Sequence, residues 1–581
     1  MTNKEEVALG RRGFLQALAI GAPVAVGAGV GQLAPTAPSA SSGIAAAAGP
    51  PATTPSGKVP LIGVDMRLTY TNPINLPSME VRSVPSAMAP TDAAVANSTG
   101  ITPILAKPQW VEADGRTLVR HAKAGFAVVT ENAYRTAADF SPVNVDGTIY
   151  LYASGSMLTP NGSRTVWSTT DYLTWTPHEM NMGVTAPTVV KVGKKFYMAG
   201  NSTPIFVADS PVGPWTEFGR FTNLDGTEIR SNDVQFFLDT DGRLYLTYNI
   251  GAPIMGVELD PNDPRKVLTK PVVVWDFDPL QEWQHFGDNK QSFAFGYVEG
   301  SQLFKVGNTY YLSVASGGTE HTTYATGVMT SKKPLEEYRY SQSNPIGYGI
   351  DTNYPSGLYP NAGHGSFVLD GAGRLMFFYT YVIAYEQGFE RRLGMDICDV
   401  TRQGMINCRL SNTPRLAPGK AVSGKDDVGL YNLSTLTSAY WASSYAPGRT
   451  PYYAGDRTLS TWWQPADTDT APTYIMGFAN PYYISAAQIH WKELGHAFTA
   501  KNAVKYMLEY RDIDSNMWRP LVDRSGNTTP YTADYTTFDR VLTHVVRLKI
   551  LGTTENAKVG VQQFNVFGEN YTLAREKGII K

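Results

Sequence analysis

The sequence predicts an all-β protein, a five-bladed β-propeller followed by a β-sandwich of the jelly-roll type. Three observations predict this fold. A short apolar run meets a tight turn and an aromatic-rich strand five times, the turns are spaced like propeller blades, and the pattern changes beyond residue 423. The 581 residues are too many for one core, so we expect at least two domains.

The five repeats occupy residues 137–418. Their turns contain Gly147, Gly193, Gly242, Gly307 and Gly373, which follow one another at spacings of 46, 49, 65 and 66 residues. Such spacings suit the blades of a propeller, in which every repeat contributes an inner strand to a central channel. We therefore expect residues at the start of the inner strands to converge on one axis.

A polar residue opens four of the five repeats: Asp139, Asp233, Glu299 and His364. These residues precede the turn glycines by eight, nine, eight and nine positions, which predicts one shared register at the channel. Three carboxylic acids and an imidazole brought together in this way form a candidate active site. Taken singly, each Asp is more often a turn or cap residue, and a structural histidine is an equal alternative for His364.

Residues 1–50 have the character of an export signal and an Ala-rich linker. Arg11 and Arg12 precede a short apolar stretch and then small residues, a pattern that resembles a twin-arginine signal; a Sec signal or a retained anchor is the alternative. No later segment approaches the roughly 20 apolar residues of a membrane span. We expect a secreted, extracellular protein that has no membrane partner after signal cleavage.

Charge and cysteine content restrict the function further. The net charge of −2 gives no basic footprint for nucleic acid, so we expect no nucleic-acid partner. Cys398 and Cys408 flank a stretch that can turn a hairpin, and in an exported protein they either form a disulfide or remain free. Two thiols without a nearby histidine do not make a metal site.

The predicted propeller domain spans residues 57–420 and includes a long lead-in before residue 137, which we expect to complete the last blade and to wall one side of the cleft. The second domain spans residues 425–570. Its strands alternate apolar and polar positions, the pattern of a sheet with one buried face. We expect two separate cores.

Four segments resemble the signature segments of glycoside hydrolase family 43 and its relative family 62: residues 137–143 (AADFSPV), 231–248, 297–312 and 363–374. Two departures affect the subfamily. Phe140 follows the first Asp, which is closer to family 62, and Val234 rather than Pro follows the second. In the second domain, residues 432–444, 452–463 and 559–568 resemble a discoidin-like (coagulation-factor type C) module, many of which bind sugars.

The resemblance implies an inverting hydrolase that acts on side chains of plant or microbial polysaccharides or on oligosaccharides. Asp139 is then the general base, Glu299 the general acid, and Asp233 the third carboxylate, which raises the pKa of the acid and orients it. Inversion needs the two carboxyl groups about 6.5–9.5 Å apart. His364 resembles a channel histidine that contacts an ion or water. We expect that no cofactor is required, and a Ca²⁺ ion near His364 is the alternative.

Arg392 or its neighbour Arg391 is expected to hold substrate hydroxyls. The loop residues Asp288, Glu320, His321 and Asp351 are weaker candidates for substrate contact, because each is more typical of a solvated surface group. In the second domain, the pairs Tyr452-Tyr453 and Trp462-Trp463 can stack on sugar rings or pack in the core.

The function we expect first is an exo-acting α-L-arabinofuranosidase. β-D-Galactofuranosidase, β-xylosidase and endo-arabinanase remain alternatives within the family, because the loops around a pocket determine the sugar. A non-catalytic sugar-binding propeller is the alternative from another class. No Gly-x-Ser-x-Gly elbow and no Gly-rich phosphate loop is present.

Overall fold

The computed structural model describes residues 64–83, 109–113, 116–120, 133–155, 163–249, 253–286, 292–296, 298–319, 323–346, 362–384, 390–408, 410, 412–422, 424–457, 459, 461–494, 499 and 501–569. The expected export signal and the loop candidates Asp288, Glu320, His321 and Asp351 lie outside these ranges. Within them, no helix is long and apolar enough to cross a membrane.

The five repeats form five antiparallel sheets in chain order. Blade 1 is β6 (Ala138–Val145), β7 (Thr148–Ser154), β8 (Thr165–Thr169) and β9 (Thr176–Glu179). Blade 2 is β10 (Thr188–Val192), β11 (Lys195–Ala199), β12 (Ile205–Ala208) and β13 (Thr216–Gly219). Blade 3 is β14 (Asn232–Leu238), β15 (Leu244–Asn249), β16 (Ile254–Asp260), β17 (Asp263–Val267) and β18 (Val272–Trp275). Blade 4 is β21 (Val298–Val306), β22 (Thr309–Ser316), β23 (Ala325–Ser331) and β24 (Arg339–Tyr340). Blade 5 is β25 (Gly363–Leu369), β26 (Leu375–Ala384), β27 (Glu390–Val400) and β28 (Ile406–Cys408).

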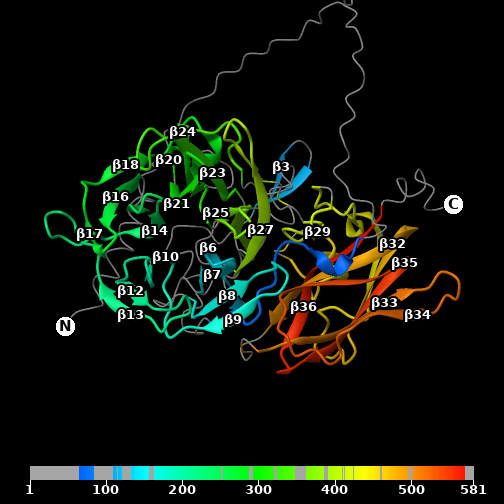
Figure 1. Cartoon of the computed structure of the whole chain (residues 1–581). Helices are drawn as coiled ribbons and strands as arrows, with labels where there is room; N and C mark the ends of the chain where they lie inside the picture. Colours follow the sequence, from blue (N-terminus) through cyan, green and yellow to red (C-terminus); the bar gives the residue numbers. More distant parts are fainter. Residues whose placement is uncertain are drawn as a thin grey trace, which may run out of the picture. The chain divides into compact units, whose positions relative to one another are not determined.

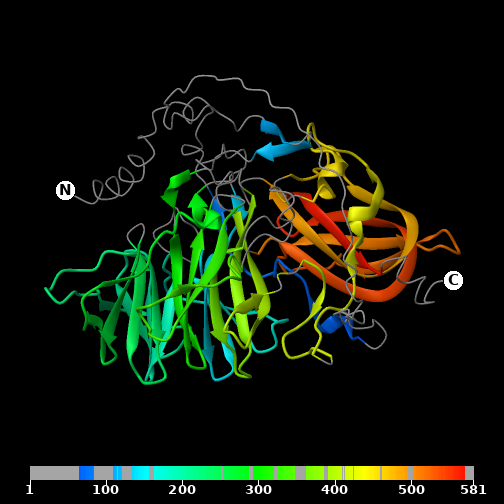
Figure 2. The same ribbon diagram turned by 90° about the horizontal axis from the view of Figure 1, so that it is seen from above.

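The blades close into a ring through side-chain packing. The inner strands β6, β10, β14, β21 and β25 each contact the next, and β25 contacts β6. Figure 1 shows these five labels grouped at the centre, with β9, β13, β17 and β24 towards the rim, and Figure 2 shows the same strands from the side. Apolar clusters join adjacent blades, and the cluster that contains Phe140 and Phe378 joins blade 5 to blade 1. The predicted all-β propeller is confirmed.

The described residues of the lead-in do not supply a strand of the last blade, contrary to our expectation. Blade 5 takes all four strands from its own repeat. From the lead-in, β1 (Thr69–Tyr70) pairs with β29 (Arg415–Leu416) from the segment that leaves the propeller, β2 (Val81–Ser83) pairs with β5 (Ala133–Arg135), and β3 (Gln109–Ala113) pairs with β4 (Arg116–Arg120). Where the lead-in is described, a single bridge from Ile74 to Leu393 on β27 adds to the edge of blade 5. A further pair, β19 (His285–Phe286) and β20 (Ser292–Gly296), precedes blade 4.

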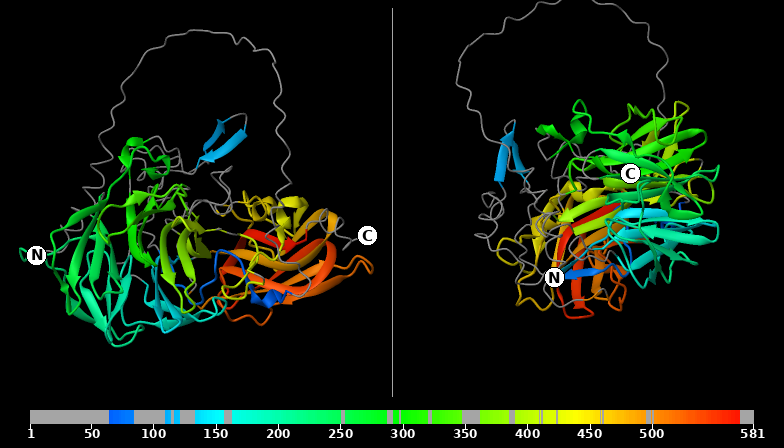
Figure 3. Two further views of the ribbon diagram at one scale, coloured as in Figure 1. Left: turned by 45° about the horizontal axis from the view of Figure 1, so that its top comes forward. Right: turned by 90° about the vertical axis from the view of Figure 1, so that its left-hand side faces the viewer.

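The second domain is one seven-stranded antiparallel sheet. Its strands are β30 (Tyr431–Asn432), β31 (Thr437–Ala442), β32 (Thr473–Leu494), β33 (Val504–Arg511), β34 (Trp518–Asp523), β35 (Ala533–Thr553) and β36 (Lys558–Gly568). Register shifts interrupt the ladder of β32, and such bulges bend a strand. One buried cluster contains Tyr474 and Trp491 from its two ends, so the sheet folds around a single core. Figures 2 and 3 show the long orange and red strands curving.

The second domain has its own buried cluster, and a small third cluster connects it with the segments on either side of the propeller. Leu416 from β29 and Leu430 pack with Ala486 and Phe567 of the second domain, and Leu68 of the lead-in lies against this cluster. Polar contacts accompany this packing. Gln488 on β32 donates to the carbonyl oxygen of Pro73 (3.3 Å), Thr69 Oγ1 lies 2.7 Å from the hydroxyl of Tyr535, and the amide of Thr532 donates to Asn75 Oδ1 (2.8 Å).

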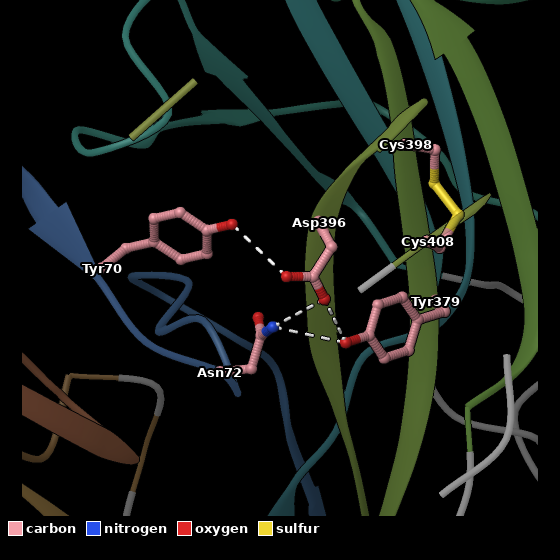
Figure 4. Close-up of a disulfide and its surroundings, with 6 residues drawn as sticks. All are labelled: Tyr70, Asn72, Tyr379, Asp396, Cys398 and Cys408. Atoms are coloured by element: carbon pink, nitrogen blue, oxygen red, sulfur yellow. Dashed lines mark hydrogen bonds between the residues drawn. A yellow bond between two sulfur atoms is a disulfide. The ribbon is translucent and has the colours of Figure 1, made fainter. Parts of the chain in front are cut away.

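Cys398 and Cys408 form a disulfide, with their Cα atoms 4.4 Å apart (Figure 4). They are register partners on β27 and β28, so the predicted hairpin is confirmed. Beside them, the buried carboxylate of Asp396 accepts hydrogen bonds from Asn72 (3.0 Å) and Tyr379 (2.7 Å). This network ties the lead-in to blade 5 because Asn72 also donates to the carbonyl oxygen of Met395 (3.1 Å).

Candidate active site

Each blade has a left-handed residue at one equivalent position, within its inner strand or, in blade 2, two residues before it. These residues are Asp139 (φ 49°), Ala186 (φ 47°), Asp233 (φ 43°), Gly300 (φ 55°) and His364 (φ 44°). In every blade this residue lies six positions before the last residue of the inner strand that pairs across the hairpin turn. These last paired residues are, in blade order, Val145, Val192, Asp239, Val306 and Asp370. In blades 1, 3, 4 and 5 a bulge of one extra residue lies here. The propeller therefore repeats a strained backbone at its channel.

This geometry corrects the predicted register of Glu299. Asp139, Asp233 and His364 occupy the left-handed position, whereas Glu299 lies one residue before it and Gly300 fills it. The glycine count was misleading because the hairpin turns differ. Gly147 is the second residue of its turn, and Gly307 is the first residue of its own. Blade 2, which gave no polar residue, has the same backbone with Ala186.

The amide groups at this position are held by side chains of the preceding blade. The amide of Asp139 donates to Thr380 Oγ1 (3.0 Å), and that of Ala186 donates to Ser154 Oγ (2.6 Å). Likewise the amide of Asp233 donates to Asn201 Oδ1 (2.6 Å), and that of Gly300 to Asp233 Oδ2 (3.1 Å). Blades 5, 1, 2 and 3 thus fix the channel residues of blades 1, 2, 3 and 4.

Asp139 is buried and stabilised as a carboxylate. Arg391 Nη1 lies 3.1 Å from its Oδ1, and His364 Nδ1 lies 3.4 Å from the same oxygen. Burial raises the pKa of Asp139, but the charges of Arg391 and His364 and a hydrogen bond from Ser154 outweigh burial and hold this pKa below its ordinary value. The group is therefore ionised over the range in which a general base must act.

Asp233 has the opposite tendency. Burial, with the charge of Asp139, raises its pKa above the ordinary value, although His364, the amide of Gly300 and the side chain of Asn201 favour the charged form. Two carboxylates with opposed pKa shifts, one buried arginine and one imidazole make the channel a site at which protons can be held or moved.

His364 lies beside Asp139, and its charge also acts on Asp233. A Cβ atom built at Gly300 would stand 2.9 Å from the His364 ring, so a side chain in that position would collide with it. Glycine suits position 300 for two reasons: it adopts the left-handed backbone without strain, and its lack of a side chain leaves space for the imidazole of His364. The ring and the backbone of blade 4 are packed together beside Asp139.

Glu299 accepts a hydrogen bond from the hydroxyl of Tyr324 to its Oε1 (2.9 Å). Tyr324 is fully buried, and burial followed by the charges of Glu299, Asp139 and Asp233 raises its pKa well above the ordinary value. The phenol therefore stays protonated and can donate its hydrogen to Glu299. Sequence reasoning missed Tyr324 because it precedes a third strand, and the repeat pattern singled out only residues at the inner strands.

Arg392 does not take the place that we expected for it. Adjacent residues of a strand point to opposite faces, and it is Arg391 that reaches Asp139. Arg392 donates instead to the carbonyl oxygens of Arg135 and Arg391, and its charge acts on His490 of the second domain. Both arginines are buried, and the prediction that Arg391 or Arg392 holds substrate hydroxyls stays a prediction.

Among the described residues, no group of three or more His, Cys, Asp or Glu side chains could hold a metal ion. The sugar-stacking candidates of the second domain divide. Trp462 and Trp463 are buried, so the core reading holds for both, whereas Tyr452 is 56% exposed.

Comparison with known proteins shows what the propeller is similar to. Residues 132–408 match the family model of glycosyl hydrolases family 43. No curated protein sequence matches the chain. Solved structures similar to it include a glycoside hydrolase (19% identity, TM-score 0.42, covering 74% of this chain and 97% of that one). An endo-1,4-β-xylanase from Bacteroides thetaiotaomicron (19%, 0.38, 47% and 94%) and an α-L-arabinofuranosidase from Clostridium thermocellum (22%, 0.35, 48% and 95%) are also similar.

The matched segment contains the whole propeller and every channel residue described above. Acid–base hydrolysis of a glycosidic bond needs two carboxyl groups, one to act as base and one as acid, and the channel holds Asp139, Asp233 and Glu299. Over residues 132–408 the propeller is thus similar to the glycosyl hydrolases of family 43, a family of inverting enzymes.

Proposed function

We propose that Asp139 is the general base and Glu299 the general acid of a single-displacement hydrolysis. Asp139 takes a proton from a water molecule whose oxygen attacks the anomeric carbon, while Glu299 gives its proton to the leaving oxygen as the glycosidic bond breaks. One observation carries the proposal: Arg391 and His364 favour the charged form of Asp139, as a base requires. The hydroxyl of Tyr324 donates a hydrogen bond to Oε1 of Glu299 and so orients the proposed acid.

Asp233 is proposed to orient the acid. Its Oδ2 accepts a hydrogen bond from the amide of Gly300, the residue that follows Glu299, so it fixes the backbone from which the acid projects. A carboxyl group beside another carboxylate also keeps its proton more firmly, which suits a general acid.

The stereochemistry of the product tests the base. An inverting enzyme releases the opposite anomer because one displacement occurs, and a retaining enzyme forms a covalent intermediate first. Proton NMR spectra recorded early in the reaction should show the inverted anomer. Retention would contradict the assignment of Asp139 as a base.

The substrate that we propose to test first is an α-L-arabinofuranoside at the end of a side chain. The Asp139-Phe140 pair supports it because this pair is closer to family 62 than the usual Asp-Pro. A panel of aryl glycosides should include β-D-galactofuranoside and β-D-xylopyranoside, with linear arabinan as the internal substrate. Turnover of another member at more than ten times the arabinofuranoside rate would replace the proposal with that sugar.

His364 is proposed to act as the partner of Asp139, with no ion required. Its Nδ1 faces the carboxylate and its ring packs on Gly300, the surroundings of a histidine satisfied by protein groups. Incubation with EDTA should leave kcat and the melting temperature unchanged. If EDTA lowers either and Ca²⁺ restores it, an ion belongs to the site.

The second domain is proposed to be a discoidin-like sugar-binding module, as its sequence segments suggest. The exposed aromatic side chains that could stack on a sugar ring are Trp441, Tyr445 and Tyr452, each 55–56% exposed. Tyr452→Ala should weaken adsorption to the polysaccharide substrate and leave turnover of a small aryl glycoside unchanged. The matched control is Tyr453→Ala, because Tyr453 lies in the same short turn but is less exposed than Tyr452.

A further inference from the structure

Arg135 of β5 and Glu493 of β32 form a buried ion pair between the propeller and the second domain. Arg135 Nε lies 2.6 Å from Glu493 Oε2, and its Nη2 lies 2.9 Å from Oε1, so the contact is bidentate. The side chains are 1% and 7% exposed. The same guanidinium donates to the carbonyl oxygens of Thr499 (3.1 Å) and Asn502 (2.8 Å), and Asn502 donates to Glu493 (3.0 Å).

Arg135, the propeller member of this ion pair, lies four residues before Asp139 in the chain. Residues 135–139 are all buried, and they run beside the start of β27. The carbonyl oxygen of Arg135 accepts from Arg392, the amide of Ala137 donates to the carbonyl oxygen of Arg391 (3.2 Å), and the amide of Arg391 donates to Thr136 Oγ1 (3.3 Å). The segment that carries Asp139 and the strand that carries Arg391 are therefore fixed to each other immediately after Arg135.

We propose that Glu493 of the second domain is a positioning residue for the general base of the propeller. By anchoring Arg135, Glu493 holds the 135–139 segment against β27 and keeps Arg391 within reach of Asp139. This inference rests on the proposed role of Asp139. It gives the second domain a part in catalysis besides any binding of polysaccharide.

The position of Arg391 has a measurable consequence. The charged or titratable groups that act on Asp139 are Arg391 from β27, His364 from β25, Asp233 from β14 and Tyr324 before β23. Of these, only Arg391 lies on the strand that is bonded to the Arg135 segment. If this strand shifts, the base loses its strongest opposite charge, and the acid limb of the kcat/KM profile moves to higher pH.

Glu493→Gln tests the proposal in the full-length protein. It keeps the size and one acceptor of the side chain but removes the charge opposite Arg135. We expect kcat on an aryl glycoside to fall about tenfold with KM within twofold, and the acid limb to rise by about half a pH unit. Glu493→Asp keeps the charge with a shorter reach and should give an intermediate kcat and an intermediate limb. If the Gln variant does not fold, an unshifted limb in the Asp variant overturns the proposal.

Glu509→Gln is the matched control. Glu509 pairs with Arg547 inside the second domain, between β33 and β35, and is similarly buried. It should lower the melting temperature and leave kcat and the acid limb unchanged. If Glu493→Gln behaves like this control, the ion pair only joins the domains and the proposal fails. Full activity of Asp139→Asn would instead refute the base assignment, whatever Glu493 does.

Discussion

Blades 2 and 3 share one backbone at the channel and differ in the side chain that it carries. Ala186 and Asp233 have φ angles of 47° and 43°, and a side chain of the preceding blade holds the amide of each. One residue presents a methyl group and the other a carboxylate. A left-handed residue at this position is therefore a property of the propeller, and the left-handed backbone alone is no evidence of catalysis.

Blade 4 gives a third arrangement of the same position. Gly300 occupies the left-handed position, and the acid of this blade is the preceding residue, Glu299, which accepts a hydrogen bond from the hydroxyl of Tyr324. In blades 1 and 3 the acids Asp139 and Asp233 occupy the left-handed position themselves. The chemistry of the channel thus depends on which side chain stands at or next to a fixed backbone, and substitutions there should separate chemistry from architecture.

The largest effect is expected from Asp139→Asn, which keeps the shape and removes the base. We expect kcat to fall about 10³-fold on every substrate, whatever its leaving group, because general-base catalysis contributes about 10²–10⁴. The melting temperature should change little. The control is Asp146→Asn in the same blade, since Asp146 is also left-handed but exposed in a turn. A loss below tenfold for Asp139→Asn would remove this residue from the mechanism.

Glu299→Gln should be the next largest. It removes the proton donor, so activity on substrates with poor leaving groups should fall by about 10² or more, and activated aryl glycosides should suffer less. Steady-state kinetics on a leaving-group series would measure the difference. Glu337→Gln, an exposed glutamate of the same blade, serves as the control. Activity within threefold of the wild type on all substrates would contradict the acid assignment.

Arg391→Gln should move the pH dependence. The charge of Arg391 favours ionised Asp139 and lowers its pKa, so without that charge the pKa rises and the base is lost at a higher pH as the solution is acidified. The acid limb of kcat/KM should rise by about one pH unit. Arg374→Gln, which breaks a turn ion pair of the same blade, should leave the limb in place. An unmoved limb in Arg391→Gln would mean that another group titrates there.

The sequence predicted the propeller because each blade repeats a local signal, a hairpin turn with an aromatic-rich strand. It also brought Asp139, Asp233 and His364 to one position. It misplaced Glu299 by one residue, since a turn glycine can be the first or the second residue of a two-residue turn. Ala186 gave no signal because a methyl group at a left-handed position resembles any other alanine.

Contacts between distant segments could not be predicted. Arg391 and Arg392 are adjacent in the chain, and only the direction of β27 decides which of them reaches Asp139. The pairing of Arg135 with Glu493 joins residues 358 positions apart. The role of Tyr324 as a hydrogen-bond donor to Glu299 becomes visible only in the folded structure, where the two side chains meet. Periodicity fixes the repeated unit, whereas such pairs follow from how the finished units pack.

The comparison of blades 2 and 4 is sharpened by exchanging their residues. Gly300→Ala should lower the free energy of unfolding by about 2 kcal/mol or more, because a left-handed side chain costs about 1–2 kcal/mol and its Cβ would meet the His364 ring at 2.9 Å. Ala186→Gly relieves a similar strain, which stabilises the protein. It also loses a buried methyl group, about 0.8 kcal/mol, and increases the entropy of the unfolded chain, and both effects destabilise the protein. The net change in the free energy of unfolding should therefore stay within about 0.5 kcal/mol. Thermal melting of both variants, and of Gly300→Ala combined with His364→Ala, separates strain from collision. If Gly300→Ala costs as much without the imidazole as with it, the collision is not the cause and the backbone angle alone requires glycine.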